Sequence, residues 1–355
     1  MFKNLNDLRS ARTVFSRYVV SAITTIAVGS LLVSCSTGDP ASNTTTRGSI
    51  NIQLSYLKNT EFAGEFLAID NGHFADAGFA NVTLTAGGSA ATAAEPQVAT
   101  GSAFLGITSP MIVGPAIAKG APVKIVGATY QQNPFTVISS TNDAITDAQS
   151  LKGKTIAVAD FNTLVWSALL KANNLTTDDV KSVPFTDGPA QLLSGQVDGY
   201  LTYTTAFRDL IPNSDTPATE MLLASAGLPM VAEVIIASTD TIKENRELLV
   251  SALTAIVKGW RDALADPTAA VSLTVDKYAA DQNLTHEREL QSMTIQNNLI
   301  QTTDTAVNGL LTVTPASQEE TVSALRLAGI DIDIDSLFDL SPLDEVYANN
   351  PELTQ

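Results

Sequence analysis

Cysteine is almost absent from this chain of 355 residues, in which Cys35 is the one thiol. Histidine is nearly as rare, with only His73 and His286. A single cysteine excludes a disulfide within the chain, and no H-E-x-x-H, C-x-x-C or G-x-S-x-G motif occurs. A G-x-x-x-x-G-K-[ST] phosphate-binding loop is missing as well. The sequence therefore predicts no metal, no cofactor and no enzymatic activity.

Positive charge is also scarce. Lys and Arg number 20 against 37 Asp and Glu, which gives a net charge of −17. A chain this acidic repels phosphate backbones, so nucleic acid is excluded as a partner. The length and a hydrophobic content of 45% allow a large core, and they favour two lobes over one.

The first 34 residues have the pattern of a lipoprotein signal peptide. A basic segment precedes the uncharged apolar run 19–33, which is too short for a confident transmembrane helix and ends in Leu32-Val33-Ser34-Cys35. This order resembles the lipobox of bacterial lipoproteins, which implies cleavage before Cys35 and a diacylglyceryl group, with acyl chains such as palmitate, on its sulfur. The alternative is an uncleaved signal anchor in which Cys35 is incidental. Residues 35–49 predict a flexible tether, and the lipid would anchor the protein on the extracytoplasmic face of the cell membrane.

From residue 50 onward, short apolar strands alternate with helices. The first series predicts strands at 50–56, 81–87, 103–109 and 123–129, with helices at 62–72, 93–99 and 110–120. A second series predicts strands at 155–160, 181–185, 197–203, 220–225 and 233–238, with helices at 164–173 and 188–196. A long amphipathic helix is predicted over 241–265, and the remainder of the chain to about residue 322 is predicted to be helical. The rhythm predicts an α/β protein with mostly parallel sheets.

Several stretches, in this order, resemble the solute-binding proteins of ABC importers, in the branch that holds the NMT1/THI5-like and SsuA-like domains. The quoted stretches are NTEFAGEFLAIDNGHFADAGFANVTLTAGG (59–88), VATGSAFLGITSP (98–110), AKGAPVKIVGATYQQNP (118–134), SLKGKTIAVAD (150–160), GQVDGYLTY (195–203) and ENRELLVSALTAIVKGWRDALADPTAAV (244–271).

The resemblance implies a type II periplasmic-binding-protein-like fold with two lobes that close on a small molecule by hinge motion. Lobe I is expected over 50–138 and 234–345, and lobe II over 139–233. The implied partners are an ABC permease and its ATPase, and the protein is expected to be a monomer. The fungal THI5-type enzymes share the fold family, but they use a cysteine-rich motif and iron that this chain lacks. A sensor that signals instead of transporting remains an alternative.

In open α/β sheets the ligand sits beyond the carboxyl ends of the strands. The loops there supply the candidate ligand-binding residues, which are Asn59, Glu61, Phe62, Gly87, Gly88, Thr108, Ser109, Gln131 and Gln132 in the first lobe, Asp160, Phe161, Asn162, Thr163, Asp187, Tyr203 and Thr204 in the second, and Glu233 near the crossing. For each residue alone, a cap or a turn is the competing interpretation, as for Asn59 and the Gly87-Gly88 pair.

The chemistry of this set points to the ligand class. It offers amides, hydroxyls, aromatic rings and carboxylates but no Arg, and Lys58 is the one nearby cation. A small anion would need positive charge. A planar heterocycle fits better, since Phe62, Phe161 or Tyr203 can stack on it and Glu61, Asp160 or Glu233 can accept from its NH groups. A thiamine-pyrimidine precursor or a riboflavin-like ligand is expected, with a sulfonate or nitrate as the alternative.

Two further features have weaker functional interpretations. The segment GIDIDID (329–335) has aspartates at calcium-loop spacing, but Ser336 and Pro342 replace the glycine and the glutamate that such a loop requires. A half-buried strand explains the same alternation. His73 takes a place where the family often has Tyr, which favours a packing role.

Overall fold

The computed structural model describes residues 47–88, 91–209 and 218–354. The predicted signal peptide, Cys35 and nearly all of the predicted tether lie outside the described residues. The chain from Thr44 to Gln355 forms one compact unit. Within the described ranges, no helix combines the length and the apolar character needed to cross a membrane.

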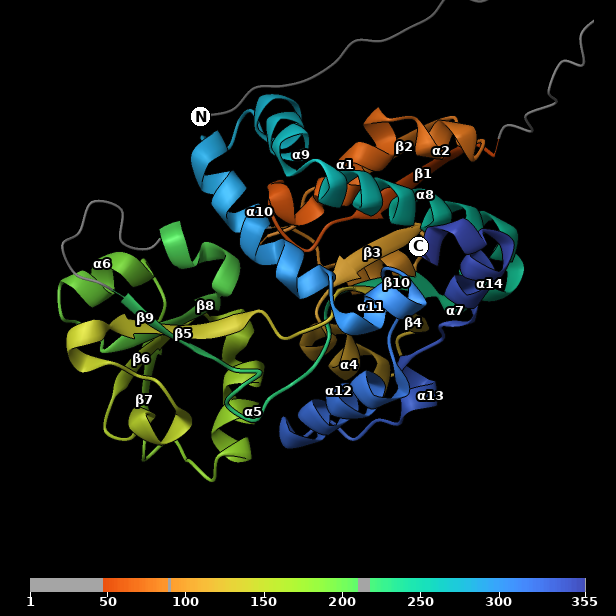
Figure 1. Ribbon diagram of the computed structural model, residues 1–355. Helices are drawn as coiled ribbons and strands as arrows, with labels where there is room; N and C mark the ends of the chain where they lie inside the picture. The colour runs from red at the N-terminus through yellow and green to blue at the C-terminus, as the bar shows by residue number, and fades with distance from the viewer. Residues whose placement is uncertain (1–46, 89–90, 210–217, 355) are drawn as a thin grey trace, which may run out of the picture. The chain divides into compact units, whose positions relative to one another are not determined.

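The first sheet has the strand order β2-β1-β3-β10-β4 (Figure 1). Its strands are β1 (Ser49–Gln53), β2 (Asn81–Thr85), β3 (Leu105–Thr108), β4 (Val123–Tyr130) and β10 (Ala232–Ser238). β1 runs parallel to β2 and β3, whereas β10 is antiparallel to β3 and β4. All seven residues of β10 are buried, which explains the continuous apolar run there.

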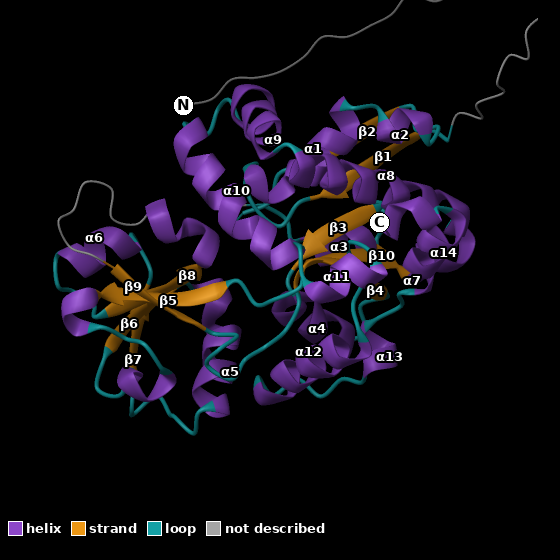
Figure 2. Ribbon diagram, in the orientation of Figure 1, coloured by secondary structure: helices purple, strands orange, loops and turns teal. Residues whose placement is uncertain are grey.

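The second sheet has the order β7-β6-β8-β5-β9 (Figure 2). Its strands are β5 (Phe135–Ser140), β6 (Thr155–Val158), β7 (Lys181–Pro184), β8 (Gly199–Tyr203) and β9 (Ala218–Leu222). β6 is parallel to β7 and β8, and β5 is antiparallel to β8 and β9. Two sheets with surrounding helices give the two-lobed α/β fold that the sequence predicts.

The chain crosses between the sheets twice, at 131–134 and at 223–231. Asn133 joins the two crossings, because its side chain donates to the Leu228 carbonyl (2.9 Å) and accepts from the Phe135 amide (3.0 Å). The second sheet therefore begins at Phe135, whereas the sequence analysis assigned 135–138 to lobe I. Pro134 has no N–H to donate to a strand ladder, so it marks the crossing in the sequence.

Helices surround both sheets. In the order of the chain they are α1 (Ala63–Asp70), α2 (His73–Asp76), α3 (Ala94–Ala99), α4 (Pro110–Ala118), α5 (Thr163–Ala172), α6 (Gly188–Leu193), α7 (Thr239–Glu244), α8 (Arg246–Ala265), α9 (Pro267–Leu273), α10 (His286–Ile300), α11 (Thr303–Asn308), α12 (Pro315–Leu327), α13 (Ile334–Leu337) and α14 (Ser341–Asn349). The predicted single helix over 241–265 is thus two helices. Asn245 has φ −117° and ψ 32°, which ends α7 and starts α8.

α1 packs directly against α8 in the core of the first lobe. Gly64 and Gly259 make this approach possible, since a Cβ on Gly259 would lie 2.1 Å from the Gly64 carbonyl oxygen. Trp260 is fully buried and its ring fills the space beside Gly64, where a Cβ would lie 2.3 Å from ring carbons. The two glycines therefore fix how deeply α1, which follows the first predicted ligand loop, sits in the lobe.

Two predictions need correction. The GIDIDID segment does not form the half-buried strand, because Asp333 caps α13 by accepting from the Ser336 amide (2.6 Å). The described residues hold no group of three His, Cys, Asp or Glu side chains arranged for a metal ion. His73 does more than pack, since its Nε2 lies 2.6 Å from Oδ2 of Asp262 and links α2 to α8.

Candidate functional site

Three of the predicted ligand residues meet in one cluster. Glu61 lies in the single 3₁₀ turn Thr60–Phe62 after β1, Glu233 lies in β10, and Tyr203 ends β8 of the second sheet. Ser55, just beyond β1, joins the carboxylates, because its Oγ is 3.3 Å from Oε1 of Glu61 and 3.0 Å from Oε2 of Glu233. The Tyr203 hydroxyl donates to Oε1 of Glu233 at 3.2 Å. We call Ser55, Glu61, Tyr203 and Glu233 the carboxyl cluster, and it contains residues of both sheets.

The loop that carries Glu61 is anchored at every polar position. The Asn59 side chain caps it by accepting from the Glu61 amide (2.8 Å). Glu289 of α10 accepts from both the amide (3.0 Å) and the hydroxyl (2.7 Å) of Thr60. Gln296, also on α10, donates to the Thr60 carbonyl at 2.9 Å. Helix α10 therefore holds the Glu61 loop in place, and the cap interpretation of Asn59 is correct for its side chain.

Aromatic side chains border the cluster. The Tyr203 ring meets Phe135 edge to face, with centroids 4.7 Å apart and planes at 87°. Tyr130 is fully buried and donates to Oε1 of Gln296 at 2.7 Å. Tyr203 is half-buried and is the predicted stacking residue that lies at the cluster. Phe62 belongs to the core with no exposed surface, and Phe161 is exposed in the turn before α5.

Burial and mutual contact favour a single shared proton on the carboxyls of Glu233 and Glu61. Burial and the neighbouring Glu61 carboxylate raise the pKa of Glu233 well above its usual range, although hydrogen bonds from Ser55 and Tyr203 oppose the shift. Burial also raises the pKa of Glu61, while its hydrogen bond with Glu233 acts in the opposite direction. Two carboxyl groups in contact cannot both ionise at low cost, so Glu233 keeps the proton and donates it to Glu61.

Glu233 also has an uncommon backbone conformation. Its φ of +46° lies in the left-handed region, which a residue with a Cβ seldom adopts. Strain of this kind persists where the surrounding structure fixes the residue, and it is frequent at functional sites. The conformation belongs to the start of a fully buried strand, where the ladder with β4 begins at Ala232.

A third acid lies one helical turn from Glu61. Glu65 is fully buried, and its Oε1 accepts from Nε1 of Trp260 at 3.3 Å, while its Oε2 has no hydrogen-bond partner. Burial raises the pKa of Glu65 to about 7, with a smaller contribution from Glu61. Burial and the nearby carboxylates likewise raise the pKa values of Tyr130 and Tyr203 well above their usual range.

The remaining predicted residues of the first lobe have other contacts. Gly87 and Gly88 lie beside the cluster, because their amides donate to the carbonyls of Tyr56 (2.8 Å) and Ser55 (3.3 Å). A Cβ on Gly87 would lie 2.3 Å from the Leu54 carbonyl oxygen, so only glycine fits there. Buried Thr108 donates to Glu95 and Ser109 caps α4, whereas Gln131 donates to the Ala128 carbonyl and Gln132 is exposed.

In the second lobe the predicted residues mainly begin helices. Asp160, Phe161 and Asn162 form the 3₁₀ turn before α5, and Thr163 donates to the Asp160 carbonyl (2.9 Å). Asp187 caps α6, and Thr204 donates to Oε2 of Glu220 at 2.8 Å. Turn and cap roles therefore account for these side chains, and the carboxyl cluster is the place where predicted residues of both lobes meet.

Sequence reasoning missed four residues around the cluster. Ser55 lies two residues beyond the end of β1, so it obeys the same rule as the residues that were chosen. Glu65 is a lone acid inside an apolar helix, which is a usable signal of a special environment. Glu289 and Tyr130 reach the cluster through tertiary packing, and nothing in their local sequence marks them.

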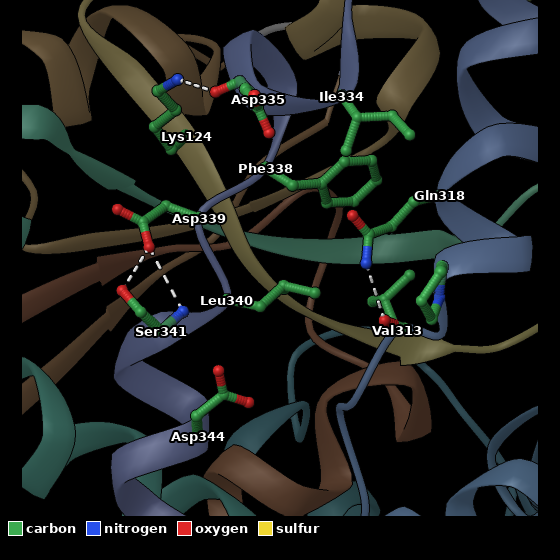
Figure 3. Close-up of a pocket in the computed structure, with 11 residues that line it drawn as sticks. Lys124, Val313, Gln318, Ile334, Asp335, Phe338, Asp339, Leu340, Ser341 and Asp344 are labelled. Carbon is green, nitrogen blue, oxygen red and sulfur yellow. Dashed lines mark hydrogen bonds between the residues drawn. The ribbon is translucent and has the colours of Figure 1, made fainter.

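Two hollows on the first lobe lie elsewhere. The first, of about 580 Å³, is bordered by Lys124 on β4 and by residues of the C-terminal segment from Val313 to Asp344 (Figure 3). Its polar groups bond to one another, since Lys124 donates to the Asp335 carbonyl and Asp339 accepts from the Ser341 hydroxyl. The second, of about 500 Å³, lies beside the start of β1. Neither hollow is lined by a predicted ligand residue.

Comparisons with known proteins agree with this architecture. The model of the NMT1/THI5 like family matches residues 59–270. The riboflavin-binding protein RibY of Chloroflexus aurantiacus is 26% identical over 282 residues, which cover 75% of each chain. The aliphatic sulphonate binding protein SsuA of Escherichia coli superposes with a TM-score of 0.57 at 15% identity, covering 82% of this chain and 92% of SsuA. The desulfurization enzyme DSZB superposes with a TM-score of 0.55 at 16% identity, covering 84% and 99%. The chain belongs to the NMT1/THI5 like family, with the fold of the periplasmic binding proteins.

Proposed function

We propose that this protein is the extracytoplasmic, lipid-anchored solute-binding component of an ABC importer, and that it binds a small NH-bearing heterocycle at the carboxyl cluster. The observation that carries the proposal is the pair of buried Glu233 and half-buried Glu61, joined by Ser55 and by Tyr203 of the other lobe. A thiamine-pyrimidine precursor or a riboflavin-like molecule supplies NH groups for the carboxylates and a flat ring for Tyr203.

The charge of the cluster argues against the anionic alternative. Of the described ionisable groups, those that shift the pKa values of Glu61 and Glu233 are carboxyls and a phenol. A sulfonate or nitrate placed beside Glu61 would meet repulsion and no compensating cation, which makes desolvation of the anion unfavourable. RibY is named as a riboflavin-binding protein, which favours the heterocycle, whereas SsuA is named as a binder of aliphatic sulphonates.

An enzyme of the THI5 type is the alternative from another class, and DSZB illustrates that the fold also serves an enzyme. The chain has no cysteine after Cys35 and thus no cysteine-rich motif for iron. Two histidines separated by more than two hundred positions each pair with an aspartate, Asp262 and Asp276. Binding without turnover is therefore the function that these residues support.

A thermal-shift screen tests the proposed function. The protein without residues 1–35 keeps the whole compact unit that begins at Thr44. A ligand that binds the folded state raises the melting temperature by mass action. We expect hydroxymethylpyrimidine, the pyrimidine precursor of thiamine, or riboflavin to raise it, and taurine and nitrate to leave it unchanged. A shift with taurine or nitrate alone would overturn the ligand class, and product formation from any hit, seen by mass spectrometry, would overturn the binding role.

The lipid anchor has a test of its own. Cys35→Ser removes the sulfur that the predicted diacylglyceryl transfer requires, so the full chain is expected to remain a longer precursor without lipid. Metabolic labelling with a fatty acid and gel mobility report both changes. Equal labelling and mobility of the wild type and the variant would refute the lipoprotein assignment.

A further inference from the structure

Glu233 is arranged to function as a carboxylate although it holds a proton in the free protein. Its two oxygens already accept from separate hydroxyls, Oε2 from Ser55 (3.0 Å) and Oε1 from Tyr203 (3.2 Å). Ser55 has one hydrogen but lies within hydrogen-bond distance of both Glu61 and Glu233. The remaining hydrogen between the two carboxyls is therefore the one that they share.

Among the described residues, no cation is found among the groups that shift the pKa values of the two carboxyls. Glu65 on the same helical stretch, Glu289 on α10, Tyr130 on β4 and Tyr203 on β8 are the groups that act on the two carboxyls or share their surroundings, and all are acids. Glu65, four residues after Glu61, is fully buried and leaves its Oε2 without any partner. A buried acid without a partner is costly when ionised.

We propose that Glu233 transfers the shared proton to a basic ring nitrogen of the incoming ligand, so that the ligand is bound as a cation between Glu61 and Glu233. This inference rests on the proposed function and narrows it to heterocycles with a basic nitrogen, such as an aminopyrimidine. The O–H bond of Glu233 breaks and an N–H bond forms on the ligand. The pair of carboxyls becomes more negative by one charge and the ligand becomes more positive by one charge. The total charge of the site is therefore unchanged.

Each partner is stabilised after the transfer. The Glu233 carboxylate keeps the donors Ser55 and Tyr203, and it gains the new N–H of the ligand. Charge-assisted hydrogen bonds of this kind are about twice as strong as neutral ones. A neutral ring without a basic nitrogen cannot take the proton, and one carboxyl then stays protonated. The cluster therefore discriminates between a basic aminopyrimidine and a neutral flavin of similar flatness.

The affinity is predicted to depend on pH with a definite sign. The bound complex contains one proton that the ligand and the pair supply together. Once the pH is high enough to remove the proton from the free pair, binding of a neutral base requires uptake of a proton from water. The dissociation constant then rises about tenfold for each further unit of pH.

Nuclear magnetic resonance of hydroxymethylpyrimidine with labelled ring nitrogens tests the transfer, because protonation moves the resonance of the ring nitrogen. At about pH 8, where the free ligand is neutral, we expect the wild-type protein to hold it protonated. Glu233→Gln keeps the shape but has no proton to give, and it should bind at least tenfold more weakly with a neutral ring. Glu319→Gln, an exposed acid on α12, is the matched control and should behave as the wild type.

A neutral ring in the wild-type complex would overturn the transfer and leave the proposed function intact. Absence of hydroxymethylpyrimidine binding to the wild-type protein would instead overturn the narrowing to a basic aminopyrimidine, and absence of riboflavin binding as well would overturn the proposed function. The shared proton is checked separately in the ligand-free protein with carbon-labelled glutamate. One carboxyl should give the resonance of a protonated acid at about pH 8, and this resonance should be absent from Glu233→Gln. Full ionisation of every glutamate at that pH would contradict the inference without any ligand.

Discussion

Glu65 gives the sharpest prediction about stability, because its burial has a direct thermodynamic consequence. Its side chain is fully buried in α1, with Trp260 as the hydrogen-bond donor to one oxygen and no partner for the other. Burial raises its pKa from 4.5 to about 7. The folded protein therefore holds this proton more tightly than the unfolded chain does, and the unfolding free energy falls as the pH rises between these two values.

The size of the effect follows from the shift. One unit of pKa corresponds to 1.36 kcal/mol, so Glu65 costs the folded state roughly 3 kcal/mol once the pH is above its folded pKa. Glu65→Gln has no charge to bury. Its amide adds an unpaired donor, which destabilises the variant by about 1 to 3 kcal/mol, but this cost is the same at every pH. The variant should therefore gain about 3 kcal/mol relative to the wild type between about pH 4.5 and about pH 8.

Urea unfolding of both proteins across this range measures the difference. Contributions of other carboxylates cancel in the comparison, and Glu319→Gln controls for the loss of one negative charge from an exposed position. If the unfolding free energies of the wild type and Glu65→Gln run parallel over the whole range, the burial argument for Glu65 is wrong.

Two other substitutions test the support of the Glu61 loop and its helix. Glu289→Ala leaves the buried amide and hydroxyl of Thr60 without their acceptor. It should destabilise the protein by roughly 2–4 kcal/mol in urea unfolding, whereas the control Glu287→Ala should be nearly neutral. Equal effects of the two substitutions would refute the anchoring role of α10. Gly259→Ala places a methyl 2.1 Å from the Gly64 carbonyl oxygen and should lower the unfolding free energy by at least about 1–3 kcal/mol, whereas Lys258→Ala should not. A stable Gly259→Ala protein would contradict the close packing of α1 on α8.

The sequence predicted nine of the ten described strands, because each of these is a short apolar run between turn residues, but it missed β5. β6, for instance, lies within the predicted range 155–160. The boundary between the lobes was harder to predict from the sequence. In β5, Thr136, Ser139 and Ser140 interrupt the apolar pattern although the strand is buried up to Ser139. Composition alone also does not reveal which sheet a strand joins. The pairing of β5 with β8 and β9 is a long-range property, and only the crossing proline gave a local sign of it.

In the candidate site, too, some residues could be predicted from local sequence and others could not. The rule that ligands lie beyond the carboxyl ends of strands selected Glu61 and Tyr203, which the structure places together through Glu233. It also selected Asp187 and Ser109, whose side chains cap helices, because a cap and a ligand contact demand the same residue types. Phe62 was chosen as a stacking ring but is core, since adjacent positions of a short turn face opposite ways and the sequence does not fix which one faces inward.

The central claim is that the two carboxyls of Glu61 and Glu233 hold the ligand. Isothermal titration calorimetry with hydroxymethylpyrimidine, on the wild type, Glu61→Gln, Glu233→Gln and the exposed control Glu319→Gln, tests it most directly. The account predicts that each of the first two variants weakens binding at least tenfold, or about 1.4 kcal/mol, while the control retains wild-type affinity. Wild-type affinity in both cluster variants would show that the ligand binds elsewhere.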